Sequence, residues 1–171
     1  MKTIVLGLVA ALMFAAPALA GQQYVDKTGF AISGYDVIAI WEQKQNPIGK
    51  RQPKATPGKA SITAEYNGAK WAFSSAANRD KFKADPAKFA PQFDGHCAYG
   101  VALGGKVPAN PHLWRIIEGK LYMNITKTVV ELWQADIPKH LKNATKNWTK
   151  LAAKPAAKRK VPELDIAKAP L

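Results

Sequence analysis

Apolar and polar residues alternate in two pairs of short runs along the chain. Each pair flanks a dipeptide that ends in glycine, Asn67-Gly68 in the first pair and Glu118-Gly119 in the second. An apolar residue at every second position marks one face of a strand, and such dipeptides favour tight turns. The pattern therefore predicts two β-hairpins, and a continuous apolar run predicts one more strand. The expected strands are residues 61–66 with 70–74, 113–117 with 120–124, and 36–41.

Apolar residues spaced by three or four positions predict helices. Ser74 or Ser75 can cap a helix that runs to about residue 84, before Asp85-Pro86. A longer pattern runs from Val129 to Leu151, and Pro138 falls within it. A proline cannot donate the hydrogen bond that a helix interior needs. We therefore expect either a kinked helix or two helices that meet at residues 136–137.

These elements predict an α+β fold, with a small antiparallel or mixed sheet of hairpins packed against helices and a helical segment at the C-terminal end. We place the domain at residues 21–151, a length sufficient for one hydrophobic core. Residues 43–60 carry three prolines, two glycines and five basic residues, which predicts a long exposed loop. Residues 152–171 are basic and rich in proline and alanine without periodicity, which predicts a disordered tail.

The first twenty residues have the features of a secretory signal peptide. Lys2 precedes a nearly continuous apolar run, and Ala18-Leu19-Ala20 forms a small-residue cleavage site before Gly21. The run is shorter than the roughly 18 to 20 residues of a membrane-spanning helix. We therefore expect cleavage after Ala20 and a periplasmic or secreted protein without a transmembrane segment.

The chain has a formal net charge of +13. Such a charge attracts nucleic acid, anionic lipid or an acidic partner. The basic residues are scattered, however, and concentrate in residues 43–60 and 152–171 rather than on a helix interleaved with aromatic side chains. We therefore expect no binding of nucleic acid. A weak association with an anionic membrane surface fits the charge better.

Cys97 is the only cysteine of the chain and lies next to His96. A single cysteine excludes an internal disulfide, so its thiol is inert, metal-bound or reactive. Residues 97–103 can form a short helix, and a thiol at the N-terminal end of a helix is stabilised as thiolate. A thiolate is a nucleophile and a ligand for soft ions such as copper(I). The alternative is a small buried side chain without chemistry.

Other side chains can complete a metal site at Cys97. His96 and His112 offer imidazole nitrogens, and Met123 offers a thioether suited to copper(I). The alternatives are an exposed loop histidine at position 112 and a core methionine at position 123. Asp36 can support the pocket, but it is also suited to capping a backbone turn. The candidates for a supporting pocket are Tyr35, Asp36 and Tyr99.

Residues 66–89 resemble a YHS domain, a family whose pattern is an aromatic hairpin strand, the motif F-C-S-x-x-C-x-x-x-F and a proline four residues later. This chain reads F-S-S-A-A-N-R-D-K-F at residues 73–82 and has Pro86. The two cysteines of the pattern are suspected ligands in metal-handling YHS domains. Ser74 and Asn78 occupy their places here. The resemblance therefore implies a metal-handling domain that has lost its usual ligand pair.

A longer stretch, residues 30–150, is similar to an exported bacterial branch, the YHS domain-containing (seleno)proteins. Four segments of that branch are echoed here in the same order and spacing. They are I-x-G-Y-D-x-V-A at 32–39, G-x-C-A-Y at 95–99, D/N-P-x-x-W at 110–114 and G-K-L-Y-L-N at 119–124. Some members carry selenocysteine, and Cys97 is the position to suspect. The resemblance thus implies reactivity or soft-metal binding at Cys97.

The sequence lacks the common signatures of a zinc hydrolase, a phosphate-binding loop and a Cys-x-x-Cys redox pair, which favours a binding protein over an enzyme. The leading hypothesis is an exported protein that binds or hands over copper at Cys97 and His96, with a metal donor or acceptor protein of the envelope as partner. One alternative is a thiol-based redox or peroxide-reactive protein acting through Cys97. Another is a non-catalytic envelope adaptor that binds through residues 43–60 and 152–171.

Overall fold

The computed structural model describes residues 21–162 and residue 164. The expected signal peptide, residues 1–20, lies outside this part of the chain. None of the helices within it combines the length and the apolar character needed to cross a bilayer.

Two antiparallel hairpins form the β-structure, where the alternating pattern predicts them. Asn67, Gly68, Glu118 and Gly119 adopt positive φ at the two turns, the backbone conformation that matches the twist of paired strands. Each hairpin is a separate two-stranded sheet, and together with the helices they confirm the predicted α+β class. The strands are β1 (Lys59–Tyr66) with β2 (Ala69–Phe73), and β3 (Asn110–Ile117) with β4 (Lys120–Asn124).

Residues 36–41 are predicted to form a strand, but the structure has a helix there. α1 (Val37–Glu42) begins after Asp36, whose side chain accepts hydrogen bonds from the backbone N–H groups of Ile38 and Ala39 at 2.9 and 3.1 Å. This cap satisfies amides that the start of a helix leaves unpaired. The strand prediction is wrong because a short, almost continuously apolar run shows neither period, so only the cap and the surroundings decide its conformation.

The helices at residues 76–84, 98–102, 127–134 and 137–151 lie where the sequence predicts them. Asp136 caps the last helix, so two separate helices meet at residues 136–137. The remaining elements are the 3-10 turns η1 (Ile32–Gly34) and η2 (Gln92–Gly95) and the helices α2 (Ala76–Ala84), α3 (Pro86–Phe89), α4 (Ala98–Ala102), α5 (Lys127–Gln134) and α6 (Ile137–Leu151).

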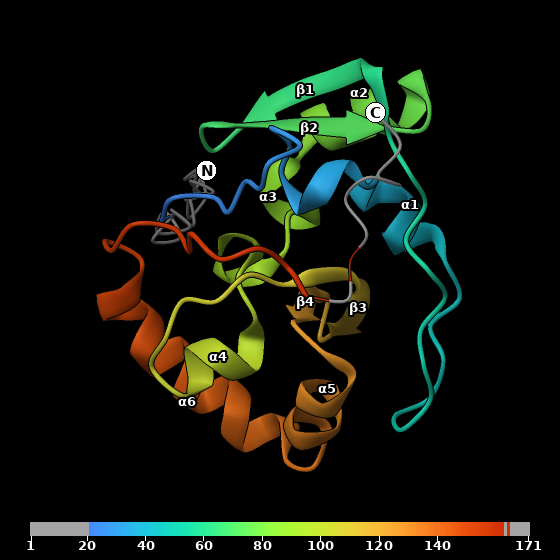
Figure 1. The fold of residues 1–171 in the computed structure, drawn as a ribbon. Coiled ribbons are helices and arrows are strands. Elements are labelled where there is room, and N and C mark those ends of the chain that lie inside the picture. The colour runs from blue at the N-terminus through green and yellow to red at the C-terminus, as the bar shows by residue number, and fades with distance from the viewer. Residues whose placement is uncertain (1–20, 163, 165–171) are drawn as a thin grey trace, which may run out of the picture.

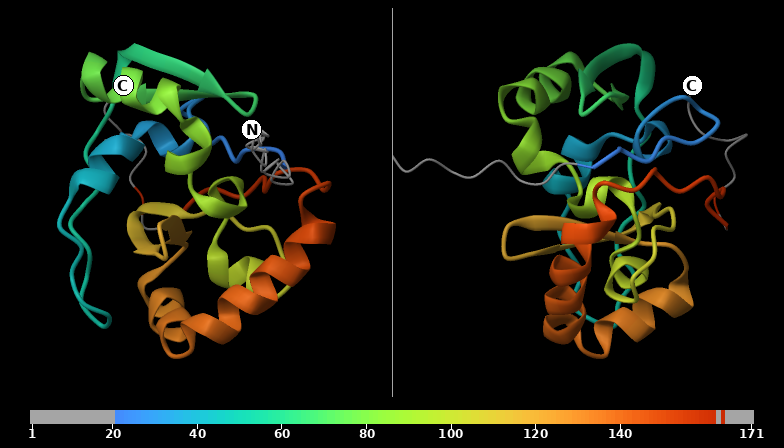
Figure 2. Two further views of the ribbon diagram at one scale, coloured as in Figure 1. Left: turned by 180° about the vertical axis from the view of Figure 1, so that it is seen from behind. Right: turned by 90° about the vertical axis from the view of Figure 1, so that its left-hand side faces the viewer.

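Two hydrophobic clusters meet at the second hairpin. Figure 1 shows this hairpin between the first hairpin and the helices α5 and α6. The first lies between the two hairpins, α1 and α2, and contains the large buried side chains Trp71 and Trp114. The second lies beneath α4, α5 and α6. β4 joins them, because Leu121 and Met123 face the first cluster while Tyr122 faces the second. Figure 2 shows α6 as a long helix along one edge of the molecule.

The basic, proline-rich residues 43–58 form a long and mostly exposed connection, as predicted. β3 holds this loop in place. Trp114 Nε1 donates a hydrogen bond to the carbonyl of Pro53 at 2.9 Å, and the guanidinium of Arg115 donates to two further loop carbonyls at 3.1 and 3.0 Å. The loop therefore runs beside the second hairpin, although the first hairpin follows it in the sequence.

Residues 152–162, in the segment predicted as a disordered tail, lie against the domain. The N–H of Ala156 donates to Gln22 Oε1 at 3.0 Å, and the carbonyl of Arg159 accepts from the Tyr24 hydroxyl at 2.8 Å. Figures 1 and 2 show this segment beside the N-terminal residues of the domain. These hydrogen bonds involve backbone groups of the segment. They therefore require no periodic pattern of apolar side chains in its sequence. Residues 163 and 165–171 lie outside the described part of the chain.

Candidate functional site

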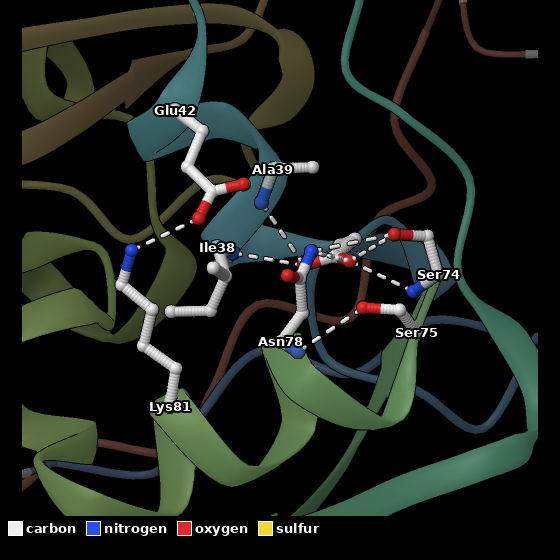
Figure 3. Close-up of polar contacts among 8 residues, drawn as sticks. Ile38, Ala39, Glu42, Ser74, Ser75, Asn78 and Lys81 are labelled. Carbon is white, nitrogen blue, oxygen red and sulfur yellow. Dashed lines mark hydrogen bonds and ion pairs between the residues drawn. The ribbon is translucent and has the colours of Figure 1, made fainter.

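Asp36 is fully buried and links α1 to the segment after β2. Its Oδ1 caps α1, and its Oδ2 accepts three hydrogen bonds. Ser74 donates from its backbone N–H and its hydroxyl at 2.7 and 2.6 Å, and Asn78 donates from Nδ2 at 2.7 Å. Figure 3 shows Ser74 and Asn78 turned toward the start of α1. Asp36 is therefore a capping and bridging residue.

Ser74 and Asn78 occupy the places of the YHS cysteine pair, and they converge as a ligand pair would. Ser74 Oγ lies 3.3 Å from Asn78 Nδ2. Both side chains are engaged with the carboxylate of Asp36, however, and hydroxyl and amide groups are poor ligands for a soft ion. In this chain the pair fixes α2 against α1.

Cys97 is fully buried at the start of α4, where it is the capping residue. Its Sγ accepts a hydrogen bond from the N–H of Gly100 at 3.4 Å and donates to Asn124 Oδ1 at 3.3 Å. Burial raises the pKa of the thiol, and the backbone N–H groups of Gly100, Ile125 and Tyr99 oppose this shift. The net direction is opposite to the lowered pKa that a redox or peroxide-reactive thiol needs.

His96 is also fully buried, and both of its ring nitrogens are engaged. Nδ1 lies 2.8 Å from the carbonyl of Phe93, and Nε2 accepts from the N–H of Ala157 at 3.1 Å. These contacts fit the neutral tautomer with its proton on Nδ1. Burial lowers the pKa of His96 to about 4, since the desolvation outweighs the hydrogen bond to Phe93. His96 and its neighbour Cys97 therefore have separate sets of partners.

His112 lies elsewhere, against Tyr35. The two rings are 4.7 Å apart at an angle of 77°, and His112 Nδ1 accepts from the N–H of Ala55 at 3.1 Å. Burial, followed by the nearby charge of Lys54, lowers the pKa of His112. The imidazole is therefore neutral at pH 7 and lines a cleft rather than the surroundings of Cys97.

Met123 and Tyr99 complete the set of predicted site residues. Met123 is buried in the first hydrophobic cluster, which agrees with the alternative of a core methionine at this position. Tyr99 is half-buried and its ring packs against His140 at 5.0 Å. Within residues 21–162 and 164, no three histidine, cysteine, aspartate or glutamate side chains gather closely enough to hold a metal ion.

A cleft of about 840 Å³ opens between the loop 49–57, the start of β3 and α5. Aromatic residues Tyr35, His112 and Trp114 line one side. Gly49 N–H donates to Gln134 Oε1 at 2.9 Å, which ties the tip of the loop to α5. The cleft is therefore lined by segments that lie far apart in the sequence.

Cationic side chains outnumber acidic ones around this cleft. Lys50, Arg51, Lys54 and Lys127 line it, against Glu131 among the described acidic residues. The sequence indicates the cationic side chains, because the loop at residues 43–60 is rich in lysine and arginine. It also indicates Tyr35 and His112 as candidate pocket residues. It contains no signal that this loop folds back on β3 and α5, because long-range backbone and side-chain hydrogen bonds hold it there.

The comparison with protein families finds a YHS domain at residues 52–93. This span covers the second half of the basic loop, the first hairpin, α2 and α3. No curated protein and no solved structure matches the chain. The exported (seleno)protein branch stays a prediction. Residues 52–93 of this chain are thus similar to the YHS domain family.

Proposed function

We propose that this is a non-catalytic binding protein whose ligand is an anion with an apolar body, held in the cleft between the loop 49–57, β3 and α5. The observation that carries the proposal is the combination of aromatic walls with four cationic side chains around one cavity. Pockets for organic ligands are mostly apolar, with a few charged groups that fix orientation. The charges here select a negative group.

The chemistry of the cleft supports binding rather than catalysis. His112 accepts a backbone hydrogen bond at Nδ1, and its lowered pKa keeps it uncharged at neutral pH. A nucleophile activated by a neighbouring base would need a hydroxyl or thiol beside that imidazole. Among the described lining residues, Tyr35 alone carries a hydroxyl, and it presents its ring to His112.

Anilinonaphthalene sulfonate, a fluorescent aromatic anion, tests this function. We expect saturable binding to the folded protein, and about fivefold to tenfold weaker binding by the charge-reversal variant Lys54→Glu. Lys142→Glu, which makes the same charge change at an exposed position of α6, is the matched control and should bind as the wild type does. Equal loss in both variants would mean that net charge, not the cleft, attracts the probe.

A second candidate is the binding of a soft metal ion, copper(I), at Cys97. Two observations support it: the YHS domain match at residues 52–93, and the hydrogen bond from the N–H of Gly100 to Sγ at 3.4 Å, which favours the anionic form of the thiol although burial raises its pKa. His96 would join only after Ala157 leaves its Nε2. Such a site would be an open two-ligand site, suited to handing over an ion between envelope proteins.

Anaerobic titration with copper(I) tests the second candidate. We expect about one equivalent bound by the wild type and none by Cys97→Ser, because the thiolate is the soft ligand. Met123→Leu is the control for an unspecific effect on the core. An unchanged stoichiometry in Cys97→Ser removes this candidate and leaves the first proposal untouched.

We also propose export, with removal of residues 1–20. Intact mass measurement of the protein recovered from the periplasm or the medium would give a chain that begins at Gly21. Recovery of the full-length chain in the cytoplasm alone would contradict export.

A further inference from the structure

Gly21, the first residue after the expected cleavage site, is hydrogen-bonded to Asp94. Its backbone nitrogen donates to Asp94 Oδ2 at 2.6 Å. Asn67 Nδ2 joins the two residues from the other side, with hydrogen bonds to Asp94 Oδ1 at 3.1 Å and to the Gly21 carbonyl at 3.0 Å. The contacts thus bring together the first described residue, the hairpin turn of β1 and β2, and η2.

The backbone around Asp94 is strained in a way that serves this contact. Asp94 has a φ of 50° and Phe93 before it a φ of 59°. Residues with a side chain adopt the left-handed region at a cost, and they persist in it where the surroundings impose it. In this conformation the carboxylate of Asp94 accepts the hydrogen bond from Gly21.

Glycine is also the residue that fits at position 21. A Cβ atom there would lie 2.6 Å from the carbonyl oxygen of Ala152 and 2.8 Å from Asp94 Oδ2. Both distances are shorter than van der Waals contact allows. Any other L-residue would push its neighbours apart, so the N-terminal end is held between Asp94 and the start of the C-terminal segment.

We propose that Asp94 is a binding site for the α-ammonium group of the mature chain, which forms when the chain is cleaved after Ala20. The inference rests on the proposed export. Hydrolysis of the bond between Ala20 and Gly21 by a signal-peptide protease consumes one water molecule. It leaves a carboxylate on Ala20 and an amine on Gly21, and the amine takes up a proton at neutral pH.

Cleavage then replaces an amide hydrogen bond by an ion pair between the same two atoms. Hydrogen bonds between charged partners are shorter and stronger than neutral ones. Among the described residues, Lys106 is the cation that acts on Asp94, and its Nζ also donates to the carbonyls of Ala152 and Lys154 at 3.3 and 2.6 Å. Tyr66 is the other titratable group near Asp94. Burial raises the pKa of Asp94, although the positive charge of Lys106 opposes this shift. The new ammonium group therefore places a second positive charge beside this carboxylate.

The experiment compares two purified chains, each released from a removable N-terminal fusion. One begins at Gly21, and the other keeps Ala20, which moves the ammonium one residue away and restores the amide. We expect the chain that begins at Gly21 to unfold at a Tm about 3 to 6 °C higher at pH 7. The same pair of chains with Asp94→Asn is the control, in which the difference should disappear.

The pH dependence separates an ion pair from a general effect of chain length. Deprotonation of the amine, which has a pKa of about 8 when free, should abolish the difference in Tm at strongly alkaline pH. An equal Tm of the two chains at pH 7, or a difference that survives Asp94→Asn, would overturn the proposal. Both chains are made without export, so a chain that proves not to be exported leaves this comparison interpretable.

Discussion

Ser74 donates both its backbone N–H and its hydroxyl to one oxygen of Asp36, at 2.7 and 2.6 Å. In the YHS pattern this place holds a cysteine. The hydroxyl lets the segment after β2 and the start of α1 share one buried carboxylate, together with Asn78. Ser74 and Asn78, at the positions where the YHS pattern has cysteines, therefore have a structural role here.

Asp36→Asn should lower the free energy of unfolding by about 2 to 4 kcal/mol. In either orientation the NH2 group of asparagine would face donors, either Ser74 and Asn78 or the N–H groups at the start of α1. Urea unfolding followed by tryptophan fluorescence measures the change. Asp80→Asn makes the same substitution at an exposed position and should have little effect. A small effect of Asp36→Asn would mean that the network contributes little.

The double variant Ser74→Cys/Asn78→Cys should gain a soft-metal site. The side-chain ends lie 3.3 Å apart in the native pair, so two thiolates at these positions can share one ion. We expect about one more equivalent of copper(I) than in the wild type by anaerobic titration. Ser74→Ala/Asn78→Ala loses the same hydrogen bonds and is the control. Equal copper binding by both double variants would contradict the prediction.

The stability of the protein should fall as the pH drops from about 6.5 toward 4. His96 takes up a proton near pH 6.5 when unfolded, but only near about 4 in the folded protein, because it is buried. The unfolded chain therefore binds more protons in this interval, and the free energy of unfolding decreases by up to about 3 kcal/mol.

Two measurements check the role of His96. NMR titration of its imidazole should show no protonation at pH 6, and urea unfolding should give a lower midpoint at pH 4.5 than at pH 7. An imidazole that titrates near pH 6.5 in the folded protein would show that His96 is solvated.

Leu164→Ser should strengthen the binding of anilinonaphthalene sulfonate about fivefold. Leu164 lines the cleft and packs against the first hydrophobic cluster, so it occupies apolar surface that a ligand would use. A tethered side chain competes at a high effective concentration. Leu103→Ser, at a leucine that is 70% exposed, is the matched control. Weaker binding by Leu164→Ser would instead make Leu164 part of the ligand's contact surface.

Local patterns predict most of the elements of this fold. The hairpin turns at Asn67-Gly68 and Glu118-Gly119, the cap at Ser75 and the break at residues 136–137 all depend on a few adjacent residues, and all are found. α1 is the exception, because its apolar run has neither the period of a strand nor that of a helix. Asp36 caps this helix with one carboxylate oxygen. Its other oxygen accepts hydrogen bonds from Ser74 and Asn78, which lie far away in the sequence.

The arrangement of the candidate site depends on contacts that local patterns do not show. Adjacency in the sequence suggested that His96 and Cys97 act together, but their side chains have different partners. Tyr35 and His112 lie far apart in the sequence, but their rings are in contact. Their meeting depends on the loop 43–58, which β3 holds through hydrogen bonds.

The sequence by itself determined the class of fold, the two hairpins, the division of the last helical segment and the absence of a cysteine pair at positions 74 and 78. These follow from periodicity, turn chemistry and residue identity, which act over a few positions. Only the tertiary structure decided that Ser74 and Asn78 hold a buried carboxylate, that Cys97 is enclosed, and that a basic cleft opens beside His112. Those outcomes depend on contacts between distant segments, where burial and hydrogen bonding set the chemistry of each group.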